Sequence, residues 1–201
     1  MSKKKKIIVT LIICAAIIIA AALVGSWLIK YLKGKPVVVD DAGKYFTCLS
    51  KESAERYAVN LVGGNGIFPD VEENGGTIEE FFFARTKFYE THIVTYATIK
   101  YNDDSYEQEM GRLSEIGVDE YTGIYSVTGA PEGYCLQAMI SDEYNGFIYA
   151  ITPEKSQDTI TYVCIYCSNY SLDSQLDEYL PKQYLLDGYD ASSDNPYKKM
   201  H

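Results

Sequence analysis

The sequence contains few of the residues that carry most hydrolytic and metal chemistry. Only two histidines occur, and His201 is the last residue, so a catalytic triad or a histidine-ligated zinc site would depend on His92 alone. We expect His92 to be an exposed structural residue at the edge of a strand. A glycine-rich phosphate loop and a nucleophile elbow are also absent. The sequence therefore predicts no cofactor and no metal centre.

Positive charge is scarce outside the amino-terminal region. Seven of the 18 Lys and Arg residues lie in 1–35, which contains no acidic residue. Residues 36–201 therefore combine 11 basic residues with all 28 acidic ones, a net charge of −17. Phosphate groups repel such a segment, which argues against nucleic acid as a partner. Cations or basic protein surfaces are the expected electrostatic partners.

One long hydrophobic run predicts a membrane-spanning helix. Residues 7–29 contain no charged residue, and 23 residues at about 1.5 Å each reach roughly 34 Å, more than a hydrocarbon core of about 30 Å. Trp27 and Tyr31 lie where interfacial aromatic residues are common. We predict an uncleaved signal anchor that binds the lipid bilayer through residues 7–29. Residues 1–6 would form a cytoplasmic tail, and the acidic domain would be extracellular.

Two other interpretations of this run remain open. A cleavable secretory signal would use Ala20–Ala22 before the cleavage site, although its apolar stretch is normally about 7–15 residues long. A lipoprotein would be modified at Cys14, but Ile13 is large for the position before the modified cysteine, and a long apolar stretch follows. The length of the run favours the anchor over both.

The rest of the chain is expected to form one α+β domain, with an antiparallel sheet and about two packed helices. After a polar stem at 30–45, we place this domain at 46–188 and a polar tail at 189–201. Residues with a period of two predict strands, and residues with a helical period predict helices. The expected strands are 77–88, 91–101, a hairpin from 134 to 151, and 159–167. The expected helices are 51–62 and 105–116, and a short helical segment is expected near 172–180.

Three details of these elements can be predicted. Asn145-Gly146 favours a two-residue type I′ turn that pairs Tyr144 with Phe147. In that register one hairpin face carries Tyr134, Leu136, Ala138, Ile140, Phe147, Tyr149 and Ile151. Asp104 and Glu107 have the spacing of a capping box for helix 105–116. Strand 159–167 has apolar residues on both sides, which is typical of a central strand.

Three short segments occur in a characteristic order. They are Ile67-Phe68-Pro69-Asp70, Glu109-Met110-Gly111-Arg112-Leu113 and Tyr179-Leu180-Pro181-Lys182-Gln183-Tyr184. The chain thereby resembles uncharacterised membrane-anchored proteins of Gram-positive anaerobes, in which a similar F-P pair, an E-x-x-R-L helix and a late Y-L-P-x-x-Y segment follow one another. The resemblance covers about residues 67–184. It implies a bacterial cell-envelope protein, and it assigns no activity and no catalytic residue.

Four of the five cysteines follow the predicted anchor, namely Cys48, Cys135, Cys164 and Cys167. Cys164 and Cys167 have C-x-x-C spacing, but they lie in a predicted strand, where residues i and i+3 face opposite sides. No helix N-terminus is expected there to lower a thiol pKa, so redox catalysis is disfavoured. Two alternatives remain: one structural disulfide joining Cys48 or Cys135 to Cys164 or Cys167, or buried free thiols.

Acidic residues are too numerous to identify a site. Glu79-Glu80, Asp103-Asp104 and Asp119-Glu120 are interpreted as solvated turns or helix caps. A late loop places four oxygen-bearing side chains together, at Asp187, Asp190, Asp194 and Asn195. This loop lacks the spacing of an EF-hand, so a solvated loop is favoured over a calcium site.

Tyrosine is abundant, with 18 of 19 residues beyond position 35. Tyrosine can form a binding surface, but it also packs well on a sheet, and we favour packing. The sequence thus predicts a single-pass, membrane-anchored, extracytoplasmic binding or scaffolding module of the cell envelope, without catalytic activity. Its partner would be an envelope protein, a peptide or a glycan. The alternative is a carboxylate-dependent cell-wall glycan hydrolase, which requires two acids that converge in a cleft.

Overall fold

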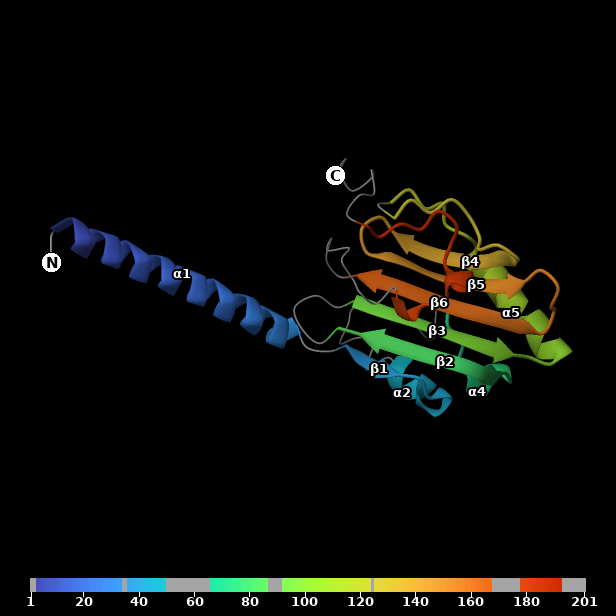
Figure 1. Ribbon diagram of the computed structural model, residues 1–201. Helices are drawn as coiled ribbons and strands as arrows, with labels where there is room; N and C mark the ends of the chain where they lie inside the picture. Colours follow the sequence, from blue (N-terminus) through green and yellow to red (C-terminus); the bar gives the residue numbers. More distant parts are fainter. Residues whose placement is uncertain are drawn as a thin grey trace. The chain divides into compact units, whose positions relative to one another are not determined.

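The computed structural model describes residues 3–33, 36–49, 66–86, 92–123, 125–167 and 178–192, with side chains at all of these except 3–11, 29–33 and 167. The chain divides into two compact units, Met1–Lys35 and Pro36–His201 (Figure 1).

The first unit is a single helix, α1 (Lys3–Lys33). Its described side chains, 12–28, include no charged residue, and Ile17, Ile18 and Ile19 are 62%, 69% and 62% exposed. Successive residues of a helix point about 100° apart, so α1 is apolar on all sides rather than along one stripe. No helix in the described part of the chain is long and apolar enough to cross a membrane. The expected span of 7–29 also includes 7–11 and 29, whose side chains lie outside the description.

The second unit is built on a six-stranded antiparallel sheet with the order β1-β2-β3-β6-β5-β4 (Figure 1). The strands are β1 (Val37–Val39), β2 (Thr77–Arg85), β3 (His92–Lys100), β4 (Tyr134–Asp142), β5 (Gly146–Pro153) and β6 (Thr159–Cys167). The α+β class and the antiparallel sheet are confirmed. The strand expected at 159–167 is β6, which pairs with β3 and β5 and is central as predicted.

Within the described residues, the helical elements of this unit with defined bounds are η1 (Ala42–Lys44), α2 (Tyr45–Leu49), α4 (Val71–Asn74), α5 (Asp103–Ile116) and η3 (Lys182–Tyr184). Element α5 confirms the helix expected at 105–116. Its N-cap is Asn102, whose Oδ1 accepts the Ser105 amide at 3.0 Å, so the prediction that placed Asp104 in a capping box is wrong. Asp104 instead lies in the first turn, where the helix dipole stabilises negative charge. The helix expected at 51–62 and most of that at 172–180 lie outside the described residues.

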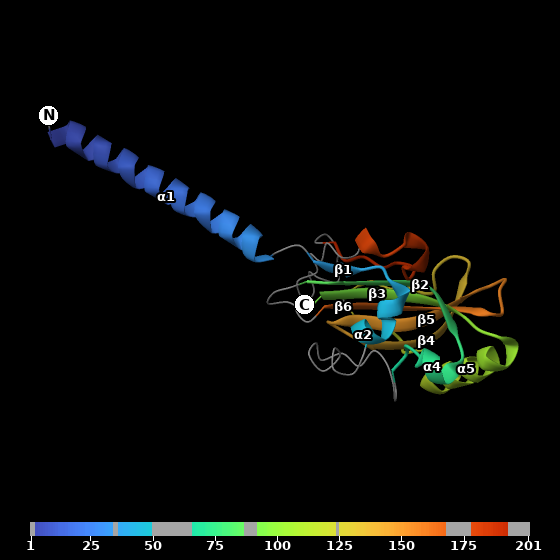
Figure 2. The same ribbon diagram turned by 90° about the horizontal axis from the view of Figure 1, so that it is seen from below.

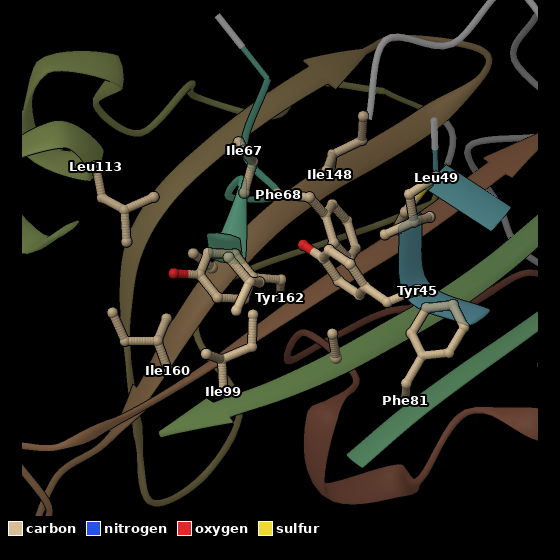
Figure 3. Close-up of a cluster of buried hydrophobic side chains, with 14 of the residues drawn as sticks. Tyr45, Leu49, Ile67, Phe68, Phe81, Ile99, Leu113, Ile148, Ile160 and Tyr162 are labelled. Carbon is tan, nitrogen blue, oxygen red and sulfur yellow. The ribbon is translucent and has the colours of Figure 1, made fainter. Parts of the chain in front are cut away.

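Both faces of the sheet are covered, so the domain has three layers. Figure 2 shows α2, α4 and α5 on one side of the sheet and the segment with η3 on the other. The first core lies under the helices and includes Phe81, Phe83 and Tyr162. Phe81 and Tyr162 are labelled in Figure 3. The second core lies on the opposite face, under residues 121–123, 125–127 and 180–191, and Phe82 packs against it. The Phe81-Phe82-Phe83 run therefore fits a strand that is covered on both faces.

The folded unit is longer than the expected domain at both ends. Val37–Val39 pair with β2, and Tyr45 is fully buried, so residues 36–45 belong to the domain and not to a stem. The apolar residues of this segment extend the edge of the sheet and the first core. This burial holds the segment in the domain although it also contains the charged residues Asp40 and Asp41. Tyr189 and Ala191 pack against the second core, so the polar tail does not begin at 189.

The β4–β5 hairpin differs from its predicted register. Asp142 pairs with Gly146, so the loop contains three residues rather than two. The Asp142 carboxylate accepts the amides of Tyr144 and Asn145 at 3.0 and 2.9 Å. This local side-chain turn replaces the expected type I′ turn, and Gly146 supplies the positive φ of 114° at which β5 begins.

A register shift between Leu136 and Ala138 then changes which side chains share a face. As expected, one face of β5 lies in the second core through Phe147, Tyr149 and Ile151. The β4 residues Tyr134 and Leu136 pack against the same core, also as expected. Ala138 belongs to the first core instead, and Ile140 is exposed. The prediction fails for these two residues because a bulge shifts the alternation of faces.

Candidate functional site

The most deeply buried acid among the described residues is Glu109, on α5, which is 1% exposed. Arg112 lies one turn further along and binds this carboxylate with two nitrogens. Arg112 Nη2 donates to Oε1 at 2.6 Å, and Nε donates to Oε2 at 2.8 Å. Burial alone lowers the pKa of Arg112, but the Glu109 carboxylate raises it overall. The two side chains thus form a bidentate ion pair.

Neutral side chains complete the hydrogen bonds of this carboxylate. Asn74 Nδ2 donates to Oε2 at 2.9 Å, and the Tyr162 hydroxyl donates to Oε1 at 2.7 Å. The Tyr101 and Tyr162 hydroxyls lie 2.8 Å apart. Burial raises the pKa of Tyr162, so its hydroxyl remains protonated. We call Glu109, Arg112, Asn74, Tyr162 and Tyr101 the Glu109 network.

The network also holds the segment that precedes α4. Arg112 donates to the carbonyls of Gly66 and Ile67, both at 2.7 Å. Phe68 packs on Tyr162, with ring centroids 5.8 Å apart (Figure 3). Two of the segments that carry the sequence resemblance, I-F-P-D and E-x-x-R-L, are therefore in direct contact. Each carboxylate oxygen of Glu109 accepts two hydrogen bonds, and each guanidinium nitrogen of Arg112 donates at least one. We therefore assign the network a structural role rather than acid–base chemistry.

Sequence reasoning did not single out Glu109. The signal that was available is the i, i+3 spacing of Glu109 and Arg112, which places both side chains on one side of a helix. Tyr106 and Leu113 lie on the same side of α5 and are buried. A charged pair within an apolar stripe indicates a buried ion pair rather than a solvated one.

The cysteines give no support to redox chemistry. Cys48, Cys135 and Cys164 are free thiols, so no disulfide links Cys48 or Cys135 to Cys164. Cys164 is fully buried in the first core, and burial raises the pKa of its thiol. The side chain of Cys167 lies outside the described residues.

His92 is 4% exposed, so the prediction that it is an exposed strand residue is wrong. Strand β3 is internal to the sheet, with β2 on one side and β6 on the other, where His92 pairs with Cys167. The sequence placed His92 correctly at the start of a strand. It did not show that the strand is covered on both sides.

The other acidic candidates lie in different segments of the chain. Glu79 and Glu80 belong to β2 rather than to a turn, and the Asp119 carboxylate accepts the Ser141 amide at 2.9 Å. Asp187 accepts the Thr128 hydroxyl at 2.8 Å. Two members of the late loop, 194 and 195, lie outside the description. No group of three or more metal-binding side chains occurs in the described ranges.

Tyrosine serves mainly in packing. Of the 14 tyrosines whose side chains are described, eight are buried and one, Tyr179, is exposed. The packing interpretation therefore holds for most of these tyrosines. Only a tyrosine near the surface could contact a partner.

One aromatic group does reach the surface. We call it the aromatic row, and it consists of Tyr179, Phe82, Tyr96, Tyr184 and Tyr134. Ring centroids of successive members lie 5.7, 5.6, 5.4 and 5.9 Å apart. Tyr179 is 38% exposed at one end, whereas Tyr96 and Tyr184 are buried. The row crosses the second face of the sheet and contains both tyrosines of the third resemblance segment, Y-L-P-x-x-Y.

Glu80 borders this row. Its Oε1 accepts the Tyr96 hydroxyl at 2.9 Å, and its Oε2 accepts the Tyr184 hydroxyl at 3.5 Å. Burial, and then the hydrogen bond to Glu80, raise the pKa of Tyr96. Glu80 is itself exposed. An exposed carboxylate held in place beside aromatic rings is the best candidate for a binding site in the described part of the domain.

No protein-family model matches the chain, and neither a curated protein nor a solved structure matches it. The resemblance to membrane-anchored proteins of Gram-positive anaerobes thus rests on the three sequence segments.

Proposed function

We propose that this protein is a single-pass membrane protein of the bacterial cell envelope, whose domain at 36–201 lies outside the membrane and binds or scaffolds a partner. The composition of α1 carries the proposal. Its side chains at 12–28 are apolar on every side and mostly exposed. Transfer of such a surface from water into hydrocarbon is favourable.

The charge distribution supports the orientation. Lys3–Lys6 precede the apolar run, and positive residues favour the cytoplasmic side. Lys30 and Lys33 follow the run, and their long side chains can extend to the lipid headgroups. The net charge of −17 over 36–201 is consistent with a domain outside the cell that does not bind nucleic acid.

Binding fits the domain better than glycan hydrolysis does. A glycosidase of the usual kind needs two carboxyl groups about 5–10 Å apart beside its substrate. Glu109 is paired with Arg112 and is only 1% exposed, so substrate cannot reach it. The aromatic row and Glu80, in contrast, offer contact area at the surface.

Fractionation of the full chain tests the proposal. We expect a chain with a carboxy-terminal epitope tag, expressed in a Gram-positive host, to remain in the membrane pellet after alkaline carbonate extraction. Protease added to intact cells should remove the tag. Release of the chain by carbonate would contradict the membrane anchor. Protection of the tag from protease would contradict the proposed orientation.

A matched pair of variants isolates the contribution of α1. Ile18→Lys with Ile19→Lys places two charges in the middle of the run, each opposing insertion by about 2.5–3.5 kcal/mol. Ile18→Leu with Ile19→Leu changes the same positions and retains their hydrophobicity. Only the lysine variant should leave the membrane fraction. If it stays, attachment does not depend on α1.

A further inference from the structure

We infer that Glu80 and the aromatic row bind a cationic side chain, an arginine or a lysine, on a basic segment of a partner protein. This inference deepens the proposed function and rests on it, because it assigns a class of partner to the domain outside the membrane. It follows from the position of Glu80, from its hydrogen bonds and from the charges around it.

The geometry places a negative charge beside exposed rings. Glu80 and Phe82 are two residues apart on β2, so their side chains lie on the same face of the sheet. Phe82 stacks between Tyr179 and Tyr96, with centroids 5.7 and 5.6 Å away. Tyr179 is exposed at the end of this stack. A cation that approaches Glu80 therefore lies within reach of aromatic faces, which attract positive charge.

The hydrogen bonds of Glu80 orient its carboxylate without neutralising it. Both donors, Tyr96 and Tyr184, are neutral hydroxyls. An ionised carboxylate has about four acceptor positions, so two of them remain for a further donor. Neither of the ion pairs found among the described residues, Lys100–Asp158 and Arg112–Glu109, involves Glu80. Glu80 thus offers a fixed, exposed charge with unused acceptor capacity.

The surroundings favour a positive ligand over a neutral one. Asp40 adds to the negative potential at Tyr96, and Glu178 directly precedes Tyr179. The domain as a whole has a net charge of −17, which attracts basic segments and repels acidic ones. A guanidinium group can pair with a carboxylate and stack on a ring at the same time, so arginine suits this arrangement best. A neutral glycan would use the rings without requiring a positive charge.

The test uses the full chain in nanodiscs of zwitterionic phosphatidylcholine, which do not attract a basic peptide by themselves. The probe is a fluorescent pentapeptide, Gly-Arg-Gly-Arg-Gly, and binding is measured by anisotropy. Its counterpart carries citrulline, a neutral isostere of arginine. We expect Glu80→Gln to weaken binding about two- to fivefold, as for one partly exposed charge pair. Tyr179→Leu, which keeps apolar cover but removes the aromatic face, should also weaken it.

Glu79→Gln is the matched control, because Glu79 is the exposed neighbour of Glu80 and carries the same charge. The inference is overturned if both glutamine variants weaken binding equally, if the citrulline peptide binds as tightly as the arginine peptide, or if the unaltered chain binds neither. Direct binding of an uncharged N-acetylglucosamine oligomer, together with no binding of the arginine peptide, also overturns it. Co-elution of the chain with the nanodiscs is a separate measurement, and its loss contradicts the membrane anchor. Unchanged peptide binding by the Glu80→Gln variant contradicts the cation site alone.

Discussion

Replacement of Arg112 by methionine tests whether the Glu109 network holds the domain together. The change removes two bonds to Glu109 and the bonds to two carbonyls, and it leaves a carboxylate in a buried site. Removing one partner of a buried ion pair costs about 3–5 kcal/mol. Because the Arg112 side chain is 28% exposed, we expect the lower end, about 3 kcal/mol. For a domain of this size the corresponding fall in Tm is about 6–12 °C.

The assay is urea unfolding of residues 36–201, since both cores consist of residues from this unit. Near-ultraviolet circular dichroism reports the packing of the tyrosines. A double variant, Arg112→Met with Glu109→Leu, also removes the unpaired buried carboxylate of Glu109. It should recover at least part of the lost stability. Lys100→Met breaks the exposed Lys100–Asp158 pair and should leave the midpoint unchanged. Equal midpoints for Arg112→Met and Lys100→Met would refute the reasoning.

Three further predictions follow from the described residues. Cys135 is exposed and should react with Ellman's reagent in the folded protein, whereas Cys164, which is buried and has a raised thiol pKa, should react only at the rate of unfolding. Gly76→Ala would place a Cβ 2.6 Å from Ile99 Cγ2 and should cost about 1–3 kcal/mol in urea unfolding. Hydrogen bonds from neighbouring hydroxyls lower the pKa of Asp158 to about 2, below its unfolded value of about 3.9. Its stabilisation is therefore present above about pH 4 and is lost as pH falls towards 2, and Asp158→Asn should flatten the pH dependence of the unfolding midpoint in that window.

Strand positions were predictable because alternation is a local property of the sequence. β3 and β6 have a period of two, and β6 has apolar residues on both sides, which indicates a strand that is buried on both faces. Loop geometry was less predictable. Asn145-Gly146 favours one turn, but the Asp142 carboxylate binds two amides of the loop and stabilises another. A single side chain thus changed the register of the hairpin.

The Glu109 network was not predictable in full because its partners are distant in sequence. Asn74 and Tyr162 lie 35 and 53 residues from Glu109. Only the spacing between Glu109 and Arg112 is local, and alone it fits a solvated pair as well as a buried one. The three resemblance segments have a common explanation in the fold. The first two meet in the Glu109 network, and the third covers the opposite face of the sheet, so all three hold an outer layer on the sheet.

The abundance of tyrosine has the same physical origin. A sheet covered on both faces needs large side chains, and a tyrosine can fill a core while its hydroxyl bonds to a segment above it. Tyr45 donates to the carbonyl of Pro69 on one face, and Tyr149 donates to that of Tyr184 on the other. Tyrosines of this kind join the layers and are not available to a partner. A tyrosine can therefore bind a partner only if it is exposed at the surface. Among the described residues Tyr179 is exposed and lies next to Phe82, on the face of the sheet that carries Glu80.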